Sequence, residues 1–443
     1  MKKIFLLSLG CPRNILDSEV LLGLLEKKDM SIVEAPEDSD IAIVNTCGFI
    51  QDAKEESINA ILQLADLKKA GTIQKIIVTG CLSQRYPDDL MKEIAEIDGM
   101  FGSSDFTKIP DYIDKMFAGE KIREVSSTPD FLYDHKFDRK ILTEKHYAYV
   151  KIQEGCSNRC TYCVIPDLKG PRRSRTIDSV VEEVKQLRKE YGIKEALIIG
   201  QDITSFGLDR SGSSELVDLI KKVSPVMQED WVRLLYTHPA HFSDELIDVV
   251  ANTNNVCKYI DLPIQHINNR ILKAMNRMVT KEQIVDLVAK IRKGIPDVVL
   301  RTSIIVGFPG ETEEEFEELM DFLEKARFER LGAFIYSQEE GTPAGEMDGQ
   351  VPQKVKEARF DAVMKLQQKI SNEDNLKYFG ETLKAIIDEK VEGEEGHYIG
   401  RSQMDAPEVD GVIFIEGEGL EPGDFVDVRI TGTMEYDLVG EVG

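Results

Sequence analysis

Three of the seven cysteines fall within one short stretch of the sequence. Cys156, Cys160 and Cys163 have the spacing C-x3-C-x2-C. Three thiolates on one loop can bind a single iron–sulfur cluster or a single metal ion, because cysteine thiolate is a usual ligand of both. A structural zinc ion prefers four ligands, and no further Cys or His lies nearby in the sequence. The spacing therefore favours an iron–sulfur cluster, with a zinc site and three buried thiols as alternatives.

Three other cysteines, Cys11, Cys47 and Cys81, show no short spacing, yet each directly follows an apolar run that predicts a buried strand. Ligand sites in open α/β sheets lie beyond the carboxyl ends of the strands, so we expect these three thiols to converge in one crevice. The alternative is three unrelated buried cysteines, since free cysteine is among the most buried residue types. Cys257 has no partner spacing and is predicted to be a core residue.

The elements that position Cys11, Cys47 and Cys81 lie in residues 1–140, where apolar runs alternate with amphipathic stretches. This alternation predicts an open parallel α/β domain. The expected strands are 3–9, 41–45 and 75–79, and the expected helices are 17–28, 54–69 and 88–97. Residues 121–146 predict a connection to the next unit.

Residues 141–375 resume the alternation, with a helical segment after each predicted strand. The six expected strands are 148–153, 196–200, 232–237, 259–263, 300–307 and 332–336. Such connections suit a parallel sheet that curls toward a barrel, and six strands are fewer than the eight of a complete one. We therefore predict a partial barrel, with the C-x3-C-x2-C run directly after its first strand.

Residues 376–443 change to short β-like runs separated by glycine-rich turns. The runs at 383–388, 412–416 and 424–431 predict a small five-stranded barrel of the OB type. This segment has 17 Asp and Glu against five Lys and Arg, a net charge of -12, within a chain whose net charge is -25. Excess negative charge opposes attraction to a phosphate backbone and favours a basic partner.

The sequence favours a cytoplasmic protein without a membrane span. The apolar run after Lys2 and Lys3 ends at Cys11 and is shorter than a usual signal segment, although a lipoprotein signal is the alternative. We see no later run of about 18 apolar residues that could span a membrane. An odd number of cysteines spread over a long chain favours metal or redox chemistry over a disulfide framework.

The C-x3-C-x2-C run, with Tyr162 before the last cysteine and at the mouth of a partial barrel, resembles the radical S-adenosylmethionine (SAM) superfamily. The resemblance implies that Cys156, Cys160 and Cys163 hold a 4Fe-4S cluster whose fourth iron binds SAM. One electron passed to SAM then releases a 5'-deoxyadenosyl radical, so the cofactors supply the difficult chemistry and the protein supplies position.

Both cysteine sets in this order, followed by the small β domain, resemble the methylthiotransferase family over essentially the whole chain. Residues 8–14, which read SLGCPRN, together with Asp17-Ser18-Glu19, resemble the RimO-type branch, which modifies a ribosomal protein. Arg13 departs slightly, since Lys is commoner there. The resemblance implies that Cys11, Cys47 and Cys81 hold a second 4Fe-4S cluster, whose open iron holds the sulfur to be transferred.

The function implied by the resemblance is transfer of a methylthio group to the β-carbon of a loop aspartate in the twelfth protein of the small ribosomal subunit. The implied partners are that basic protein and an external electron donor. A methylthiotransferase acting on C2 of tRNA adenosine is the first alternative, and the acidic terminal domain disfavours it. A non-catalytic iron–sulfur electron-transfer protein is the second alternative.

Several polar residues follow predicted barrel strands, where the catalytic groups of barrels gather. Gln201 and Asp202 are predicted SAM contacts on this ground, and Gln265 and His266 are candidate catalytic residues, with His238 a weaker site candidate. The radical SAM resemblance implies that the segment containing Gly307 and Glu311 lines the SAM site. Arg175, which follows the cysteine loop closely, is a further candidate catalytic residue. The alternatives are ordinary loop polarity for 201–202, a tight turn for 305–311, a satisfied structural group for each histidine, and a solvated basic turn for 172–175.

Overall fold

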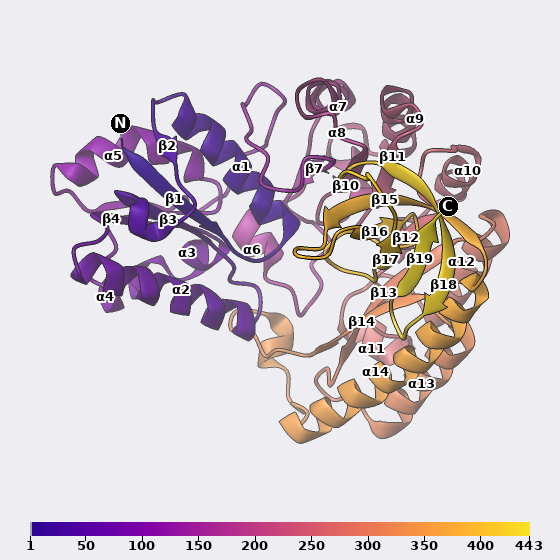
Figure 1. Cartoon of the computed structure of the whole chain (residues 1–443). Coiled ribbons are helices and arrows are strands. Elements are labelled where there is room, and N and C mark those ends of the chain that lie inside the picture. Colours follow the sequence, from indigo (N-terminus) through magenta and orange to yellow (C-terminus); the bar gives the residue numbers. More distant parts are fainter. Residues whose placement is uncertain (1) are drawn as a thin grey trace.

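The computed structural model describes residues 2–443 and contains three units, with the first on one side and the other two packed together on the other (Figure 1). The first unit is a six-stranded parallel sheet with the order β2-β1-β3-β4-β5-β6. Its strands are β1 (Lys3–Ser8), β2 (Ser31–Ile32), β3 (Ile41–Thr46), β4 (Lys75–Gly80), β5 (Gly99–Phe101) and β6 (Ile122–Glu124).

Helices cover both faces of this sheet, which explains why its central strands are apolar throughout. On β3, Ile41 and Ile43 pack into the core on one face, while Ala42 and Val44 pack into the core on the other. The helices are α1 (Pro12–Glu26), α2 (Gln51–Lys69), α3 (Cys81–Arg85), α4 (Pro87–Glu93) and α5 (Ile109–Phe117).

The predicted strands β1, β3 and β4 and the three predicted helices are present, with shifted ends. Helix α1 begins at Pro12, five residues before the predicted start, because proline suits the first position of a helix. The predicted connection 121–146 is wrong in part, since β6 adds an edge strand to the first sheet. Strands of two or three residues are too short to leave a pattern in the sequence.

The middle unit is a partial barrel built from two three-stranded parallel sheets, β11-β10-β7 and β12-β13-β14. A bridge between Val232 and Val256 links them, and all six predicted strands are present. The strands are β7 (Tyr147–Lys151), β10 (Glu195–Ile199), β11 (Trp231–Leu234), β12 (Tyr259–Asp261), β13 (Val299–Val306) and β14 (Arg330–Ile335).

Helices pack on the outside of these strands, and Cys257 is buried as predicted. A hairpin of β8 (Gln153–Glu154) and β9 (Arg173–Ser174) encloses the cysteine loop and α6 (Ile165–Lys169). The other helices are α7 (Ile177–Tyr191), α8 (Leu208–Ser211), α9 (Leu216–Met227), α10 (Asp244–Asn252), α11 (Asn269–Ala274), α12 (Lys281–Gly294), α13 (Glu313–Ala326) and α14 (Gln353–Asn375).

The terminal unit is a closed five-stranded barrel with the order β15-β16-β17-β19-β18, as predicted. Figure 1 shows its yellow strands lying over the strands of the partial barrel. The rings of Trp231 and Phe425 pack edge to face with 4.9 Å between their centroids, and the Tyr259 hydroxyl donates to Asp410 at 2.6 Å. The strands are β15 (Thr382–Lys390), β16 (His397–Ser402), β17 (Ile413–Glu416), β18 (Phe425–Thr433) and β19 (Leu438–Val442).

A buried ion network joins the terminal barrel to the partial barrel. Glu195 on β10 accepts from Arg233 at 2.6 Å and also pairs with Arg401 on β16. All three side chains are almost wholly buried, so each charge depends on the others. Within residues 2–443, none of the helices combines the length and apolar character that a membrane crossing needs.

Candidate iron–sulfur sites

The structure brings Cys11, Cys47 and Cys81 together at one edge of the first sheet. Strands β1, β3 and β4 are neighbours that end at the same edge of the sheet, with Ser8 of β1 beside Asn45 of β3, and Thr46 of β3 beside Gly80 of β4. A Cβ atom on Gly10, which has a φ of +91°, would lie only 3.0 Å from the sulfur of Cys47. Glycine before Cys11 therefore lets the first loop approach the second cysteine closely.

Two asparagines that the sequence analysis did not single out hold this edge together. The Asn14 amide donates to the Leu9 carbonyl at 3.0 Å and to the Thr46 carbonyl at 3.1 Å. The Asn45 amide donates back to the Asn14 carbonyl at 2.9 Å. These bonds connect the loops that carry Cys11 and Cys47. In the sequence, the only sign of a role for Asn14 is its place in the SLGCPRN motif.

Burial and two cations set the protonation of these thiols. Burial raises the pKa of Cys81 to about 12, against the opposing charge of Lys169. Burial by itself would also raise the pKa of Cys11. The charge of Arg13 and the hydrogen bond from its Nε–H to the sulfur, 3.4 Å away, outweigh burial, so the pKa of this thiol lies below its ordinary value. Iron binds thiolates, so loading of this site must release protons from the more basic thiols.

The second set, Cys156, Cys160 and Cys163, lies on the loop after β8. The Cys163 amide donates to the Cys160 carbonyl at 3.1 Å, which makes a tight turn, and the Cys156 amide donates to Gly170 at 3.2 Å. Arg277 approaches the Cys160 sulfur at 3.6 Å. Burial raises the pKa of Cys163 to about 12, and the neighbouring Cys160 adds to the effect.

Both sets fit a 4Fe-4S cluster with one open iron. Each offers three sulfur atoms, and none of these six cysteines is in a disulfide. Each set has a basic side chain within reach of a cysteine sulfur, Arg13 in the first and Arg277 in the second. Thiolate ligands with nearby hydrogen-bond donors are the usual surroundings of such clusters. The ligand roles of the six cysteines stay a prediction.

The two cysteine sets face each other across the interface between the first unit and the partial barrel. Arg13, two residues after Cys11, donates to the carbonyl of Gly200 at the end of β10, at 2.9 Å. The charge of Arg13 also lowers the pKa of Cys163, a smaller effect than burial. One cation therefore acts on sulfur atoms of both sets.

Asp202, a predicted SAM contact, supports the second cysteine loop. Its Oδ2 atom accepts from Asn158, which lies between Cys156 and Cys160, at 2.8 Å. The same oxygen lies 2.8 Å from Nδ1 of His241. A carboxylate at the end of β10 thus fixes the loop that presents the cysteines.

Asp202, His238 and His241 place three potential ligand atoms within 4.8 Å of one another. The hydrogen bonds argue against a cation there, because Nδ1 of His238 accepts from the Ala240 amide at 3.2 Å. The ring proton then sits on Nε2, which is buried and has no partner among residues 2–443. Burial and the charge of Arg277 lower the pKa of His238 to about 3, so its ring is neutral. His238 can therefore donate one hydrogen bond to a bound group.

Gly307, Glu311 and His266 form one buried unit after β13. Glu311 accepts from the amides of Gly307 and Phe308, which fixes the turn. Nε2 of His266 lies 3.5 Å from the other Glu311 oxygen, while its Nδ1 accepts from Asn268 at 3.0 Å. Glu311 and His266 are wholly buried in this pairing. Their predicted roles toward SAM or substrate remain predictions.

The remaining predicted residues divide between the interface and the structural core. Gln201 donates to Glu154 at 2.7 Å, beside the cysteine loop. Gln265 has a φ of +69° and donates through its backbone amide to Ser303 at 2.9 Å. Arg175 is held by Glu183 and by backbone carbonyls, so its contacts among the described residues are structural.

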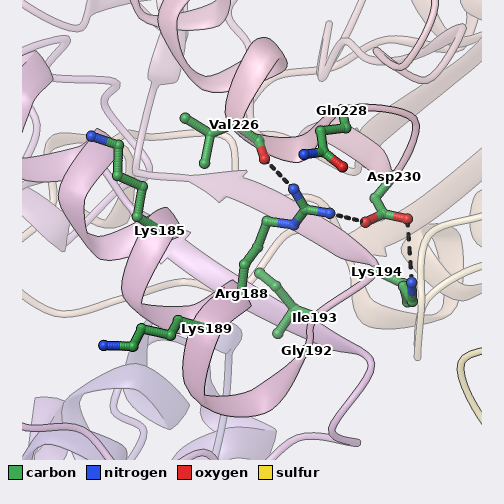
Figure 2. Close-up of a pocket in the computed structure, with 9 residues that line it drawn as sticks. All are labelled: Lys185, Arg188, Lys189, Gly192, Ile193, Lys194, Val226, Gln228 and Asp230. Atoms are coloured by element: carbon green, nitrogen blue, oxygen red, sulfur yellow. Dashed lines mark hydrogen bonds and ion pairs between the residues drawn. The ribbon is translucent and has the colours of Figure 1, made fainter.

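A surface pocket (Figure 2) lies at the amino ends of β10 and β11, whereas the second cysteine set lies beyond the carboxyl ends of the barrel strands. Its lining comes from the end of α7 and from the segments that precede β10 and β11. Arg188 crosses it to reach the Val226 carbonyl and Asp230, with 2.5 Å to the carboxylate (Figure 2). This arrangement ties two helix ends together and is separate from both cysteine sets.

Three family models match the chain in the order of its three units. Residues 3–102 match the model described as "Uncharacterized protein family UPF0004". Residues 150–323 match the radical SAM superfamily, and residues 379–442 match the TRAM domain. The three matches fall within the first sheet, the partial barrel and the closed barrel, although β6 and β14 lie outside the matched ranges.

Solved structures share this fold at low sequence identity. The radical SAM methyltransferase TsrM from Kitasatospora setae, solved with cobalamin and a [4Fe-4S] cluster, aligns with a TM-score of 0.56 at 15% identity. The alignment covers 78% of this chain and 74% of that one. The cobalamin-dependent radical SAM enzyme OxsB aligns with a TM-score of 0.53 at 13% identity, over 83% and 56% of the two chains.

Full-length relatives are far more similar. The ribosomal protein uS12 methylthiotransferase RimO of Desulforamulus reducens is 47% identical over 443 residues, which is 100% of both chains. RimO of Clostridioides difficile is 44% identical, over 100% of this chain and 99% of its own. With such identity along its whole length, the chain belongs to the RimO family of radical SAM methylthiotransferases.

Proposed function

We propose that this protein transfers a methylthio group to the β-carbon of a loop aspartate in ribosomal protein uS12. One observation carries the proposal: two sets of three cysteines converge at facing edges of two units, in a chain whose relatives are named for this activity. We assign the first set to residues 1–140, the second to residues 141–375, and a role in recognition to residues 376–443.

When bound, two 4Fe-4S clusters and SAM supply the methylthio group and the radical that removes a hydrogen atom from an unactivated carbon. The chain itself supplies the ligands, with Cys11, Cys47 and Cys81 at the first site. Cys156, Cys160 and Cys163 serve the second.

The residues around the second site orient its loop and exclude water. Asp202 holds Asn158, and through it the loop between Cys156 and Cys160. The neutral His238 directs a buried N–H into the same region, where it can hold an acceptor group of SAM or of the substrate. Arg277 lies against Cys160 and donates to the Pro263 carbonyl, so it links the loop to the end of β12.

The terminal barrel favours a basic substrate over tRNA. Its net charge of -12 attracts a positively charged ribosomal protein and repels phosphate. Much of this charge is exposed, for example at Glu392, Glu394 and Glu395. We further propose that the enzyme acts in the cytoplasm, away from membranes, and takes its electrons from an external donor.

Reductive cleavage of SAM separates this proposal from a non-catalytic electron-transfer role. We expect the anaerobically reconstituted, reduced protein to convert SAM to 5'-deoxyadenosine and methionine, measured by liquid chromatography. We expect the same reaction with uS12 present to yield a methylthio adduct on one aspartate-containing peptide. Absence of SAM cleavage in a protein that holds both clusters would contradict the proposal.

A further inference from the structure

Arg13 joins the first cysteine set to the partial barrel through three different contacts. Its Nε–H points at the Cys11 sulfur, 3.4 Å away, and Nη1 donates to the Gly200 carbonyl at 2.9 Å. The guanidinium carbon lies 4.5 Å from the centroid of the Tyr236 ring. The Nε–H, the Nη1 group and one face of the planar guanidinium each have a contact, so the orientation of the group is fixed.

The charge environment of Arg13 differs from that of the other cations at this interface. Lys169 and Arg139 each pair with a carboxylate, Asp17 and Glu19 respectively. For Arg13, no carboxylate of residues 2–443 lies within 4.0 Å. Its contacts are a neutral carbonyl, a ring and the sulfur of Cys11, so a thiolate or cluster ligand at Cys11 would be the anion in direct contact with it.

We propose that Arg13 is a positioning residue for methylthio transfer. It holds the loop of Cys11 next to the end of β10 and places a positive charge beside the sulfur atoms there. The inference rests on the proposed function, because it assumes a cluster on Cys11, Cys47 and Cys81.

Two physical consequences follow from this placement. Hydrogen bonds and charge at cluster sulfur help to set the reduction potential, and a cation favours the more negative reduced state. Arg13 should therefore make the potential of the first site more positive. A lysine retains the charge but cannot reproduce the planar fork that contacts both Cys11 and Gly200, so the two roles are separable.

The test uses the full-length chain in which Cys156, Cys160 and Cys163 are replaced by Ala, so that one cluster remains. Arg13→Gln and Arg13→Lys are introduced into this triple variant. The reduction potential and the EPR signal of the remaining cluster are recorded after reconstitution. Lys54→Gln is the matched control, because Lys54 also crosses this interface, to Glu339 at 2.9 Å, without a contact to cysteine sulfur.

We expect Arg13→Gln to retain about four irons and to shift the potential to a more negative value. Arg13→Lys should shift it less, and Lys54→Gln should leave it unchanged. In the chain with both cysteine sets, Arg13→Gln should lower methylthio transfer by about tenfold or more while SAM cleavage persists.

An unchanged potential in Arg13→Gln would overturn the inference, as would an equal shift in Lys54→Gln, which would indicate domain docking alone. If the parent triple variant held no iron, the proposed function of the first site would fail, and this inference with it. Iron content therefore distinguishes the two failures.

Discussion

Asp17 and Lys169 form a buried ion pair, with 2.9 Å between Oδ2 and Nζ, that connects α1 of the first unit to α6 of the partial barrel. Asp17 follows Cys11 by six residues, and Lys169 follows Cys163 by six. Lys151 approaches the other Asp17 oxygen at 2.5 Å and also pairs with Glu154 at 2.6 Å. The two cysteine sets are thus held in a fixed relation by a network that excludes solvent.

Replacing Asp17 with Asn should destabilise the folded chain strongly. It removes the carboxylate that neutralises Lys151 and Lys169, and breaking a buried pair typically costs about 3–5 kcal/mol. Thermal unfolding of the reconstituted protein measures the loss. Asp88→Asn is the control, because its pair with Arg123 is exposed and worth about 1 kcal/mol or less. Equal stability of the two variants would contradict the role given to Asp17.

The two cysteine sets should lose iron independently. After anaerobic reconstitution we expect about eight irons per chain, and about four when either set is replaced by Ala. Loss of Cys156, Cys160 and Cys163 should abolish SAM cleavage. Loss of Cys11, Cys47 and Cys81 should spare SAM cleavage and abolish methylthio transfer. A variant lacking the first set that still holds eight irons would refute the assignment of two sites.

Asp202→Asn should weaken the second site selectively. Asn158 and His241 would lose their shared carboxylate, so the loop of Cys156 and Cys160 would be less well fixed. Replacing a residue that supports the ligands of a metal site typically lowers metal affinity or activity by about 10–100-fold. We therefore expect the rate of SAM cleavage to fall by at least about tenfold. Asp209→Asn, whose carboxylate bonds to Ser174 instead, is the control. Identical rates in both variants would argue against this role.

The acidic surface of the terminal barrel should speed encounter with a basic substrate. Neutralising Glu392, Glu394 and Glu395 to Gln should lower kcat/KM for uS12 and weaken its salt dependence, with SAM cleavage unchanged. Gln at the exposed residues Glu314, Glu317 and Glu324 on α13 changes the net charge equally and serves as the control. If the two triple variants behaved alike, net charge alone would explain the effect.

Deleting residues 376–443 would change more than substrate recognition. A separate small barrel, as the sequence predicts, could be removed with recognition impaired more than SAM cleavage. In the structure, Arg401 of this unit neutralises the buried Glu195, and Asp410 accepts from Tyr259 inside the partial barrel. Deletion would leave Glu195 and Arg233 without Arg401 and would destabilise the partial barrel itself.

Much of the fold could be predicted from the sequence because its main strands are continuous apolar runs. Convergence of Cys11, Cys47 and Cys81 followed from their positions after neighbouring parallel strands. The partners of Arg13 and Asp17 could not be predicted, because Gly200 and Lys169 lie 187 and 152 residues further along the chain. Asp17 and Glu19 belong to a sequence motif, and only the packing of the units shows that Asp17 binds Lys169 of the partial barrel and that Glu19 binds Arg139.

The most direct test of the proposed function offers uS12 and tRNA together to the anaerobically reconstituted enzyme with SAM and a reductant. Mass spectrometry then reads both products from the same reaction. We predict a methylthio group on the β-carbon of one uS12 aspartate and unmodified tRNA. A methylthio adduct on tRNA adenosine, with uS12 unmodified, would contradict the account.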